Sequence, residues 1–365
     1  MMPTRLPGNA PTRRGLLGGI AAAAAGTALP ARHTLADPGA GPTPNVAANI
    51  AALHRAAQAE GKLVYWSAEE TPLARAMMAR FTATYPGIEA TQFRIEPASS
   101  AHRILAEHQA GQVNVDAFNM PLLFMQPILE QQLAVPVDWA GLYGADPELV
   151  MYGGRGLCCW DLEMPLCINT DLTSAGAITS WEDLLKPAWR GKVLLEARGL
   201  PLAILMRDPA DGGWGEARVL EYIAKLKAND PVVLLGGSPA AEALASGRAA
   251  VAIGTYSSKI DLYRRAGGPV DWLTVGPIPA ITYVMCVASG CAHPNAARLW
   301  AQWTAGAGSE AVFETTNFGL VHGRKLSPNG RKMRAAGARI VLEDSDVAAN
   351  QRRLSLVAAA IGALK

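Results

Sequence analysis

The chain has 365 residues, of which 50% are hydrophobic and 18% are charged, and its formal net charge is +2. This length predicts two domains, and the apolar content predicts sizeable buried cores, which excludes a disordered chain. The weak positive charge argues against a dense basic surface, so we expect no nucleic-acid partner.

The N-terminus has the pattern of an export signal. Arg13 and Arg14 precede a short apolar run that ends in small residues, and cleavage is expected after Ala36. The paired arginines resemble the twin-arginine signal, which exports proteins that have already folded. Residues 1–36 are therefore predicted to be a signal peptide, followed by a flexible, proline- and glycine-rich leader at 37–48. The alternative is an N-terminal membrane anchor, for which the apolar run is short.

Alternating strands and helices predict the fold class. Short apolar runs of strand length are separated by stretches with apolar residues at helical spacing. This order predicts an α/β protein with parallel-rich sheets and crossover helices. The expected strands are at 62–66, 88–95, 113–118, 163–170, 193–195, 232–235, 249–253, 271–275 and 282–288. The expected helices are at 49–61, 73–84, 101–110, 198–207, 214–228, 240–245, 293–304 and 344–365, with a short one from Ser180 that has a near capping box.

The stretch 246–259 is the centre of the functional prediction. Residues 249–253 have the length and apolar content of a buried parallel strand, and a polar loop follows them. Ligands of open α/β sheets bind at the carboxyl ends of the strands. Thr255 and Tyr256 are therefore candidate ligand contacts.

Three earlier strands also end in polar residues. Backbone N–H groups and serine hydroxyls at such ends suit an anion. The alternative is that these side chains only cap the helices that follow. The candidates are Ser67, Ala68, Glu69, Ser99, Ser100 and Asn119.

Two strand ends in the second half of the chain add further candidates. Arg198 can pair with a carboxylate or phosphate through its guanidinium fork, or it can be a solvated loop residue. Gly237 and Ser238 open a helix, where their amides suit an anion or simply begin the helix.

The sequence contains no combination that predicts catalysis or a resident cofactor. There is no nucleophile–base–acid set, no glycine-rich phosphate loop and no metal signature in a supporting context. His102, His108, His293 and His322 show no metal-ligand spacing. We therefore expect a protein that is not an enzyme and has no cofactor.

Five cysteines make an odd count, and export would permit disulfides. Cys167 and Cys286 both fall on expected strands, and one hypothesis is a bridge between them. The alternative is buried free thiols. The spacing of Cys286 and Cys291 is not that of a zinc site, and the pattern for Cys158 and Cys159 stays open.

A set of phrases in a fixed order resembles a known family. They are Leu63-Val64-Tyr65-Trp66-Ser67-Ala68, Tyr85-Pro86-Gly87-Ile88, Val115-Asp116-Ala117-Phe118, Ile168-Asn169-Thr170-Asp171, Trp181-Glu182-Asp183-Leu184, Pro187-Ala188-Trp189-Arg190-Gly191-Lys192 and Ala292-His293-Pro294-Asn295. The set is similar to the periplasmic solute-binding proteins of ABC importers, closest to the ferric-ion-binding group with the type II periplasmic binding fold. Relatives of that group also take thiamine, polyamines, phosphonates and other small polar solutes.

The resemblance implies two lobes that close on a ligand about two crossing strands. Lobe one would comprise 60–165 and 277–365, and lobe two 168–273. The implied protein is a periplasmic monomer that delivers a solute to an ABC permease in the inner membrane. The same fold can instead report its ligand to a membrane sensor kinase.

The resemblance leaves the ligand open. Ferric binders of this group usually carry two adjacent tyrosines at the loop that here contains Tyr256, but Ser257 follows it. Tyr263 lies a helix further on and is a poor substitute. If ferric iron is bound directly, Tyr256 and Glu69 are the candidate ligands; chelated iron, a phosphonate or a carboxylate fits at least as well.

Overall fold

The computed structural model describes residues 44–69, 71–306, 310, 319–323 and 325–362. The expected signal peptide at 1–36 and the first part of the expected leader lie outside these ranges. The rest of that leader prediction is wrong, because residues 44–48 begin helix α1 (Pro44–Glu60). Proline suits the first turn of a helix, and Leu53 and Ala57 are buried where α1 packs against α10 (Pro294–Ala305).

The larger sheet has seven strands and combines parallel and antiparallel pairs. β1, β2 and β3 are parallel, as predicted, and β11 is antiparallel to both β3 and β5. The order is β2-β1-β3-β11-β5-β4, with β12 beside the start of β11. The strands are β1 (Lys62–Ser67), β2 (Glu89–Arg94), β3 (Ala117–Pro121), β4 (Val150–Met151), β5 (Gly156–Glu163), β11 (Ile278–Val287) and β12 (Ile340–Leu342).

The smaller sheet has five strands in the order β10-β6-β9-β7-β8. β7 is parallel to β8 and β9, as the alternation of strand and helix predicts, while β6 and β10 run antiparallel. The strands are β6 (Cys167–Asn169), β7 (Val193–Glu196), β8 (Val232–Leu234), β9 (Val251–Ile253) and β10 (Val270–Trp272). The prediction of an α/β protein with two sheets is therefore confirmed. The sheets are mixed rather than parallel-rich, because parallel and antiparallel pairs are equal in number in each of them.

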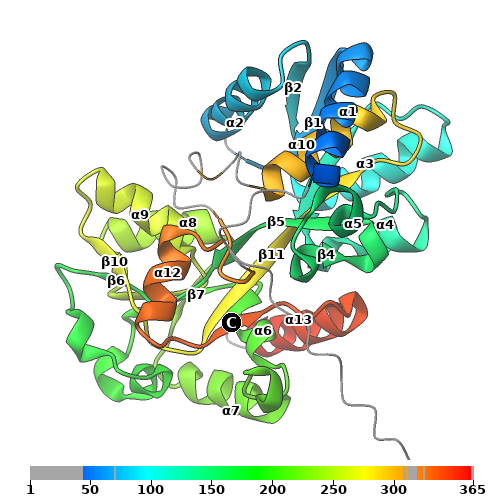
Figure 1. Ribbon diagram of the computed structural model, residues 1–365. Coiled ribbons are helices and arrows are strands. Elements are labelled where there is room, and N and C mark those ends of the chain that lie inside the picture. Colours follow the sequence, from blue (N-terminus) through cyan, green and yellow to red (C-terminus); the bar gives the residue numbers. More distant parts are fainter. Residues whose placement is uncertain (1–43, 70, 307–309, 311–318, 324, 363–365) are drawn as a thin grey trace, which may run out of the picture. The chain divides into compact units, whose positions relative to one another are not determined.

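Helices flank both sheets (Figure 1). The larger sheet is accompanied by α2 (Thr71–Thr84), α3 (Pro97–Gln109), α4 (Gln126–Glu130) and α5 (Trp139–Tyr143), besides α1 and α10. The smaller sheet is accompanied by α6 (Leu200–Leu205), α7 (Glu216–Lys227), α8 (Gly237–Ala245) and α9 (Ser257–Arg265). Trp300 of α10 is fully buried and packs against Tyr65 and Phe81, which anchors α10 on β1.

The chain crosses between the two sheets twice. It leaves the larger sheet after Glu163 and enters the smaller one at Cys167, and it returns between Trp272 and Ile278. Figure 1 shows the long strands β5 and β11, which carry these crossings, side by side. The lobe limits inferred from the family resemblance stay predictions.

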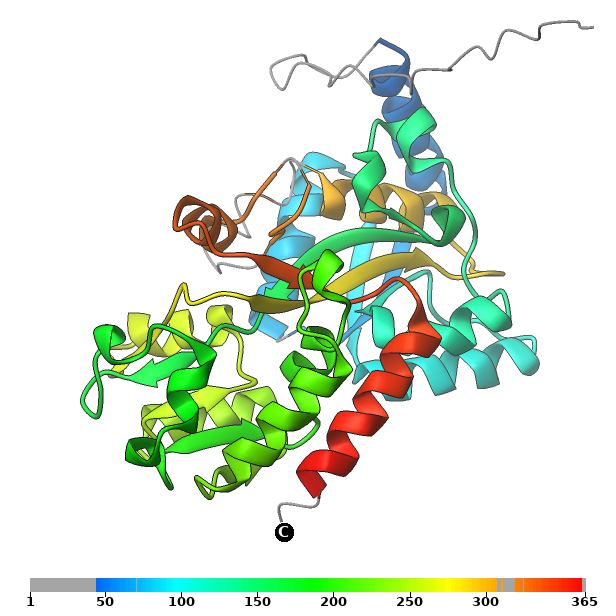
Figure 2. The same cartoon turned by 90° about the horizontal axis from the view of Figure 1, so that it is seen from below.

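The C-terminal helices pack against helices that accompany the smaller sheet. α13 (Val347–Gly362) lies along α6 and α7 (Figure 2), and Arg352 forms an ion pair with Glu216 of α7. α12 (Pro328–Ala335) lies next to α9, where the Asn329 amide donates to Asp261. After the chain has returned to the larger sheet, two of its last helices therefore contact helices that accompany the smaller sheet.

Several element boundaries differ from the predictions. Asn119 lies inside β3 rather than beyond its end, and Ser99 and Ser100 lie in the first two turns of α3. Most of β5 was not predicted, because residues 156–159 show no alternation of polar and apolar positions and the alternation is limited to residues 160–163. The capping box at Ser180 is confirmed, although the element that it begins is a 3₁₀ helix.

All five cysteines are free, so the hypothesis of a bridge between Cys167 and Cys286 is wrong. The Cys167 thiol donates to the Pro165 carbonyl, whereas the Cys286 sulfur contacts Met125 in a different apolar cluster. Buried free thiols, the alternative, are what the fold contains. Among the described residues, no helix combines the length and the apolar content needed to cross a membrane.

Gly254 ends β9 in a conformation that suits only glycine. Its φ is +102°, and a Cβ atom there would meet Glu196 Cβ at 2.4 Å. We expect Gly254→Ala to lower the free energy of unfolding by at least about 1–3 kcal/mol, measured by urea denaturation. Gly176→Ala is the matched control, because open space surrounds that position. Equal stability of the two variants would contradict the conclusion that position 254 requires glycine.

Candidate functional site

The carboxyl ends of six parallel strands surround one cavity of about 580 Å³. Three of these strands, β1, β2 and β3, belong to the larger sheet, and β7, β8 and β9 belong to the smaller one. Its lining residues are Ala68, Glu69, Leu73, Arg94, Glu96, Pro97, Pro121, Leu123, Phe124, Trp160, Leu162, Arg198, Leu200, Leu235, Gly236, Gly237, Ser238, Pro239, Tyr256, Ser258, Lys259, Ile281 and Tyr283. We call this cavity the cleft. Its position is the one at which open α/β sheets bind ligands.

The loop after β1 contributes Ala68 and Glu69 to the cleft, while Ser67 is buried behind them. The Ser67 hydroxyl accepts a hydrogen bond from the Gln92 amide. Glu69 accepts from the Tyr65 hydroxyl and from the Asn119 amide, at 2.5 Å for the latter. Asn119 is thus a buried support for Glu69 rather than part of the cleft lining. Burial raises the pKa of Glu69 despite these donors.

The last residue of β2, Arg94, and the following Glu96 and Pro97 line the cleft. The two predicted serines do not line it: Ser99 is exposed, and Ser100 is buried in α3. The Ser100 hydroxyl has no hydrogen-bond partner among the described residues. The segment predicted from Ser99 and Ser100 therefore lies next to the cleft, but the residues that line the cavity there are Arg94, Glu96 and Pro97.

The second half of the chain contributes Arg198, Gly237, Ser238 and Tyr256, all of which were predicted. Arg198 forms an ion pair at 2.9 Å with the buried carboxylate of Glu196. This ion pair fixes the arginine at the end of β7 and leaves its side chain 45% exposed.

Thr255 is fully buried and does not line the cleft. Its hydroxyl donates to the Gly237 carbonyl at 2.8 Å, which ties the β9 loop to the beginning of α8. Gly237 in turn lies against the Tyr256 ring, since a Cβ atom on it would approach Cε2 to 2.8 Å. A side chain at position 237 would therefore collide with the Tyr256 ring in its present position.

The floor of the cleft is formed by two cross-strand pairs that the sequence did not predict. Trp160 of β5 faces Tyr283 of β11, with ring centroids 5.9 Å apart in a stacked arrangement, and Leu162 faces Ile281. Alternate residues of a strand face the same side. Tyr283 was detectable in principle as a lone polar aromatic residue in an apolar strand, but Trp160 lay in a strand that was not predicted.

The two cleft tyrosines are neutral phenols at neutral pH. Burial raises the pKa of Tyr256 to about 12, although the nearby Arg198 charge lowers it. Burial also raises the pKa of Tyr283 well above its ordinary value, and a neighbouring Tyr256 phenolate would raise it further. Both hydroxyls are therefore suited to donating hydrogen bonds to a ligand, beside the cationic side chains of Arg94, Arg198 and Lys259.

A buried hydrogen bond joins the end of β5 to the helix that follows the Tyr256 loop. The Ser257 hydroxyl is 2.5 Å from Glu163 Oε2, and it accepts from the Asn329 amide of α12. Burial raises the pKa of Glu163 to about 8, the nearby Asp161 and Asp261 charges also raise it, and the Ser257 hydrogen bond lowers it. The first crossing of the chain is thus linked to the cleft through a carboxyl group that is protonated at neutral pH.

Glu163 should make the protein less stable as pH rises from 4.5 to about 8. In this window the folded state retains a proton that the unfolded state has lost, so the free energy of unfolding falls, by up to about 1.4 kcal/mol per pH unit. Glu163→Gln should reduce this slope in urea titrations, whereas Glu242→Gln, at an exposed position of α8, should leave it unchanged. A slope unaffected by Glu163→Gln would contradict the prediction; the buried Glu343 contributes a slope of the same sign.

Residues 67–311 match the family model described as bacterial extracellular solute-binding protein. The chain therefore belongs to this family, whose members bind solutes for ABC transporters. Together with the two sheets and the cleft, this match identifies the architecture as the two-lobed type II periplasmic binding fold.

Solved structures at low sequence identity show the same fold. Iron-bound HitA from Pseudomonas aeruginosa is 15% identical, with a TM-score of 0.69 over 82% of this chain and 99% of that one. Trichodesmium IdiA (FutA) in complex with iron and citrate is 13% identical, with a TM-score of 0.64 over 82% and 99%. AfuA from Actinobacillus pleuropneumoniae, with fructose-6-phosphate bound, is 17% identical, with a TM-score of 0.61 over 81% and 96%. A search of curated proteins by sequence found no match.

Proposed function

We propose that this solute-binding protein captures a small organic anion with an apolar part and delivers it to an ABC permease in the inner membrane. The observation that carries the proposal is the composition of the cleft. Arg94, Arg198 and Lys259 offer positive charge, and the Tyr256 and Tyr283 hydroxyls offer further donors. A carboxylate, phosphate or phosphonate group is recognised by this chemistry.

The rest of the cleft favours an apolar part of the same ligand. Trp160, Leu162 and Ile281 form its floor, while Leu73 and Phe124 lie on its sides. Apolar and aromatic walls with a few placed polar groups are typical of small-molecule sites. A highly hydrated solute without an apolar surface would leave these side chains without a matching contact.

Direct binding of ferric iron is supported less well than binding of an organic anion. Tyr256 has no adjacent tyrosine, and its phenol would have to lose a proton that its buried position retains. Glu69 already accepts hydrogen bonds from Tyr65 and Asn119. A ferric chelate with carboxylate groups remains within the proposed ligand class, because it presents carboxylates to the same cations.

We further propose that the protein is exported to the periplasm. The arginine pair at Arg13 and Arg14 supports export of the folded chain into the periplasm by the twin-arginine route. We expect a monomer without a catalytic role or a nucleic-acid partner. A gene neighbourhood with a permease and an ATPase would favour transport, and one with a histidine kinase would favour the alternative role in sensing.

A thermal-shift screen of residues 37–365 tests the ligand class. These residues include the whole compact unit that begins at Pro42. Aromatic or branched aliphatic carboxylates and phosphonates should raise the melting temperature, because a ligand that binds only the folded state stabilises it by mass action. Ferric citrate, ferric salts and polyamines complete the panel. A shift with polyamines alone would overturn the anionic class, and turnover of a substrate would overturn the binding role.

Two substitutions test whether the ligand binds in the cleft, by calorimetric titration with the anion that gives the largest thermal shift. Arg198→Ala should weaken binding about tenfold or more, since hydrogen bonds to charged groups contribute about 1.5–3 kcal/mol. Tyr256→Phe should weaken it several-fold. The matched controls are Arg248→Ala and Tyr263→Phe, which change residues outside the cleft lining. Arg198→Lys keeps a positive charge beside Glu196. If this variant still binds the anion, the loss of binding in Arg198→Ala is due to the lost charge and not to misfolding. Unchanged affinity of Arg198→Ala and Tyr256→Phe would show that the ligand binds elsewhere.

A further inference from the structure

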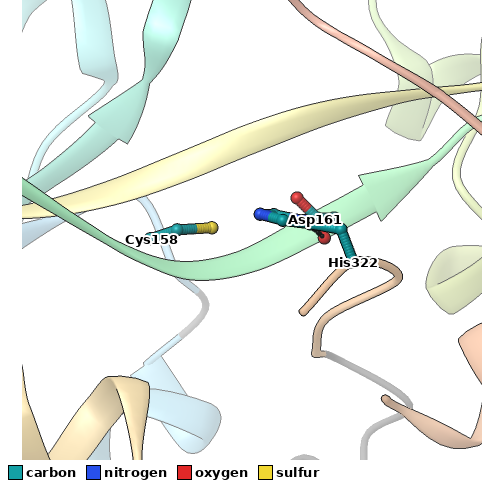
Figure 3. Close-up of side chains that lie close together, drawn as sticks. All are labelled: Cys158, Asp161 and His322. Carbon is teal, nitrogen blue, oxygen red and sulfur yellow. Dashed lines mark hydrogen bonds and ion pairs between the residues drawn. The ribbon is translucent and has the colours of Figure 1, made fainter. Parts of the chain in front are cut away.

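We propose that Cys158, Asp161 and His322 form a binding site for a thiophilic divalent cation such as zinc. One ligand atom from each residue lies within 4.8 Å of the other two, and the group brings together a thiol, a carboxylate and an imidazole (Figure 3). These residues do not line the cleft, so the inference is independent of the proposed function.

An irregularity in β5 builds the site. Trp160 pairs with Tyr283, but the next residue of β11, Val284, pairs with Cys158, so Cys159 is an extra residue in the ladder. Residues three apart on a regular strand face opposite sides. The bulge restores Cys158 and Asp161 to the same side, opposite the one on which Trp160 faces the cleft.

Asp161 is positioned by donors that act on both of its carboxylate oxygens. The Thr282 hydroxyl donates to Oδ1 at 2.9 Å, and the Val321 N–H group donates to Oδ2 at 2.9 Å. His322 Nδ1 lies 2.7 Å from the same Oδ2. Partners of this kind orient the ligands of metal sites and contribute to metal affinity. The segment that holds His322 also forms a bridge between Gly319 and Asp161, which fixes its approach to β5.

Charge and access also suit a divalent cation. A thiolate and a carboxylate together neutralise two positive charges, so the occupied site carries no net charge where Cys158 and Asp161 are buried. Sulfur, nitrogen and oxygen donors in one small group match the preferences of zinc. The His322 side chain remains 18% exposed, which gives the ion a route from solvent. A fourth position would be left for water.

Binding would be an exchange of the cation for protons. The Cys158 thiol would release its proton to solvent as the thiolate binds the ion, and His322 would bind as a neutral imidazole. No oxidation or reduction is involved. Without an ion, the His322–Asp161 contact still attaches the segment 319–323 to β5, so a purely structural contact is the competing account.

Metal titration of residues 37–365, reduced and freed of metal with a chelator, distinguishes the two accounts. We expect one zinc ion per chain by calorimetry, a higher melting temperature with zinc, and a thiolate-to-metal absorption band when cobalt(II) is added. Cys158→Ser should abolish the band and lower zinc affinity at least about tenfold. Cys286→Ser is the matched control, since Cys286 is also a buried free cysteine but lies outside the group.

His322→Ala provides a second test at a partly exposed position, with His102→Ala as the control for adventitious binding to a surface histidine. The first should weaken zinc binding and the second should not. Absence of the cobalt band, or equal zinc affinity of the wild type and Cys158→Ser, would overturn the proposal and leave the His322–Asp161 contact as a structural clamp. Neither result depends on whether an organic anion binds in the cleft.

Discussion

The antiparallel pairing of β5 with β11 connects the two sheets and forms the floor of the cleft. These two strands are neighbours in the larger sheet, and the chain passes to the smaller sheet after β5 and returns from it into β11. Their facing side chains make the floor of the cleft on one side. On the other side they place Asp161 beside Thr282 and Cys158 beside Val284. A single ladder therefore contributes to the connection between the two sheets, the floor of the cleft and the proposed metal site.

The bulge at Cys159 gives this ladder two different faces. Without the extra residue, a strand that presents Trp160 and Leu162 to the cleft would also present Cys158 to it. The bulge instead sends the thiol to the side of Asp161, so the cleft keeps an aromatic and aliphatic floor. Bulges are common next to functional sites because they redirect one side chain without ending the pairing.

Buried polar groups connect the crossings to the cleft loops. Glu163 at the end of β5 contacts Ser257, which directly follows Tyr256, and Ser257 also contacts Asn329 of α12. Thr255 ties the same loop to the start of α8. Since a buried polar group without a partner is costly, these contacts favour one arrangement of the loop. They make the Tyr256 loop part of the framework that joins the two sheets.

Local sequence patterns were sufficient to predict the α/β class, the parallel strands and the loops that face the cleft. Strand length, apolar runs and polar strand ends are local properties, so they were sufficient to select Glu69, Arg198, Gly237, Ser238 and Tyr256. They could not separate these residues from Ser67, Asn119 and Thr255, which turn inward and support the loops through hydrogen bonds. Whether a polar side chain at a strand end faces a cavity or a neighbour depends on packing, which local pattern does not record.

The contribution of β5 to the cleft and the free state of the cysteines depend on contacts between distant parts of the chain. β5 is buried on both faces, and its alternation of apolar and polar residues is limited to Trp160–Glu163. Cys158 and His322 are 164 residues apart, and Cys167 and Cys286 lie in separate apolar clusters despite their similar predicted positions. Register and a one-residue bulge bring the first pair together, and both arise from pairing between distant strands rather than from local sequence.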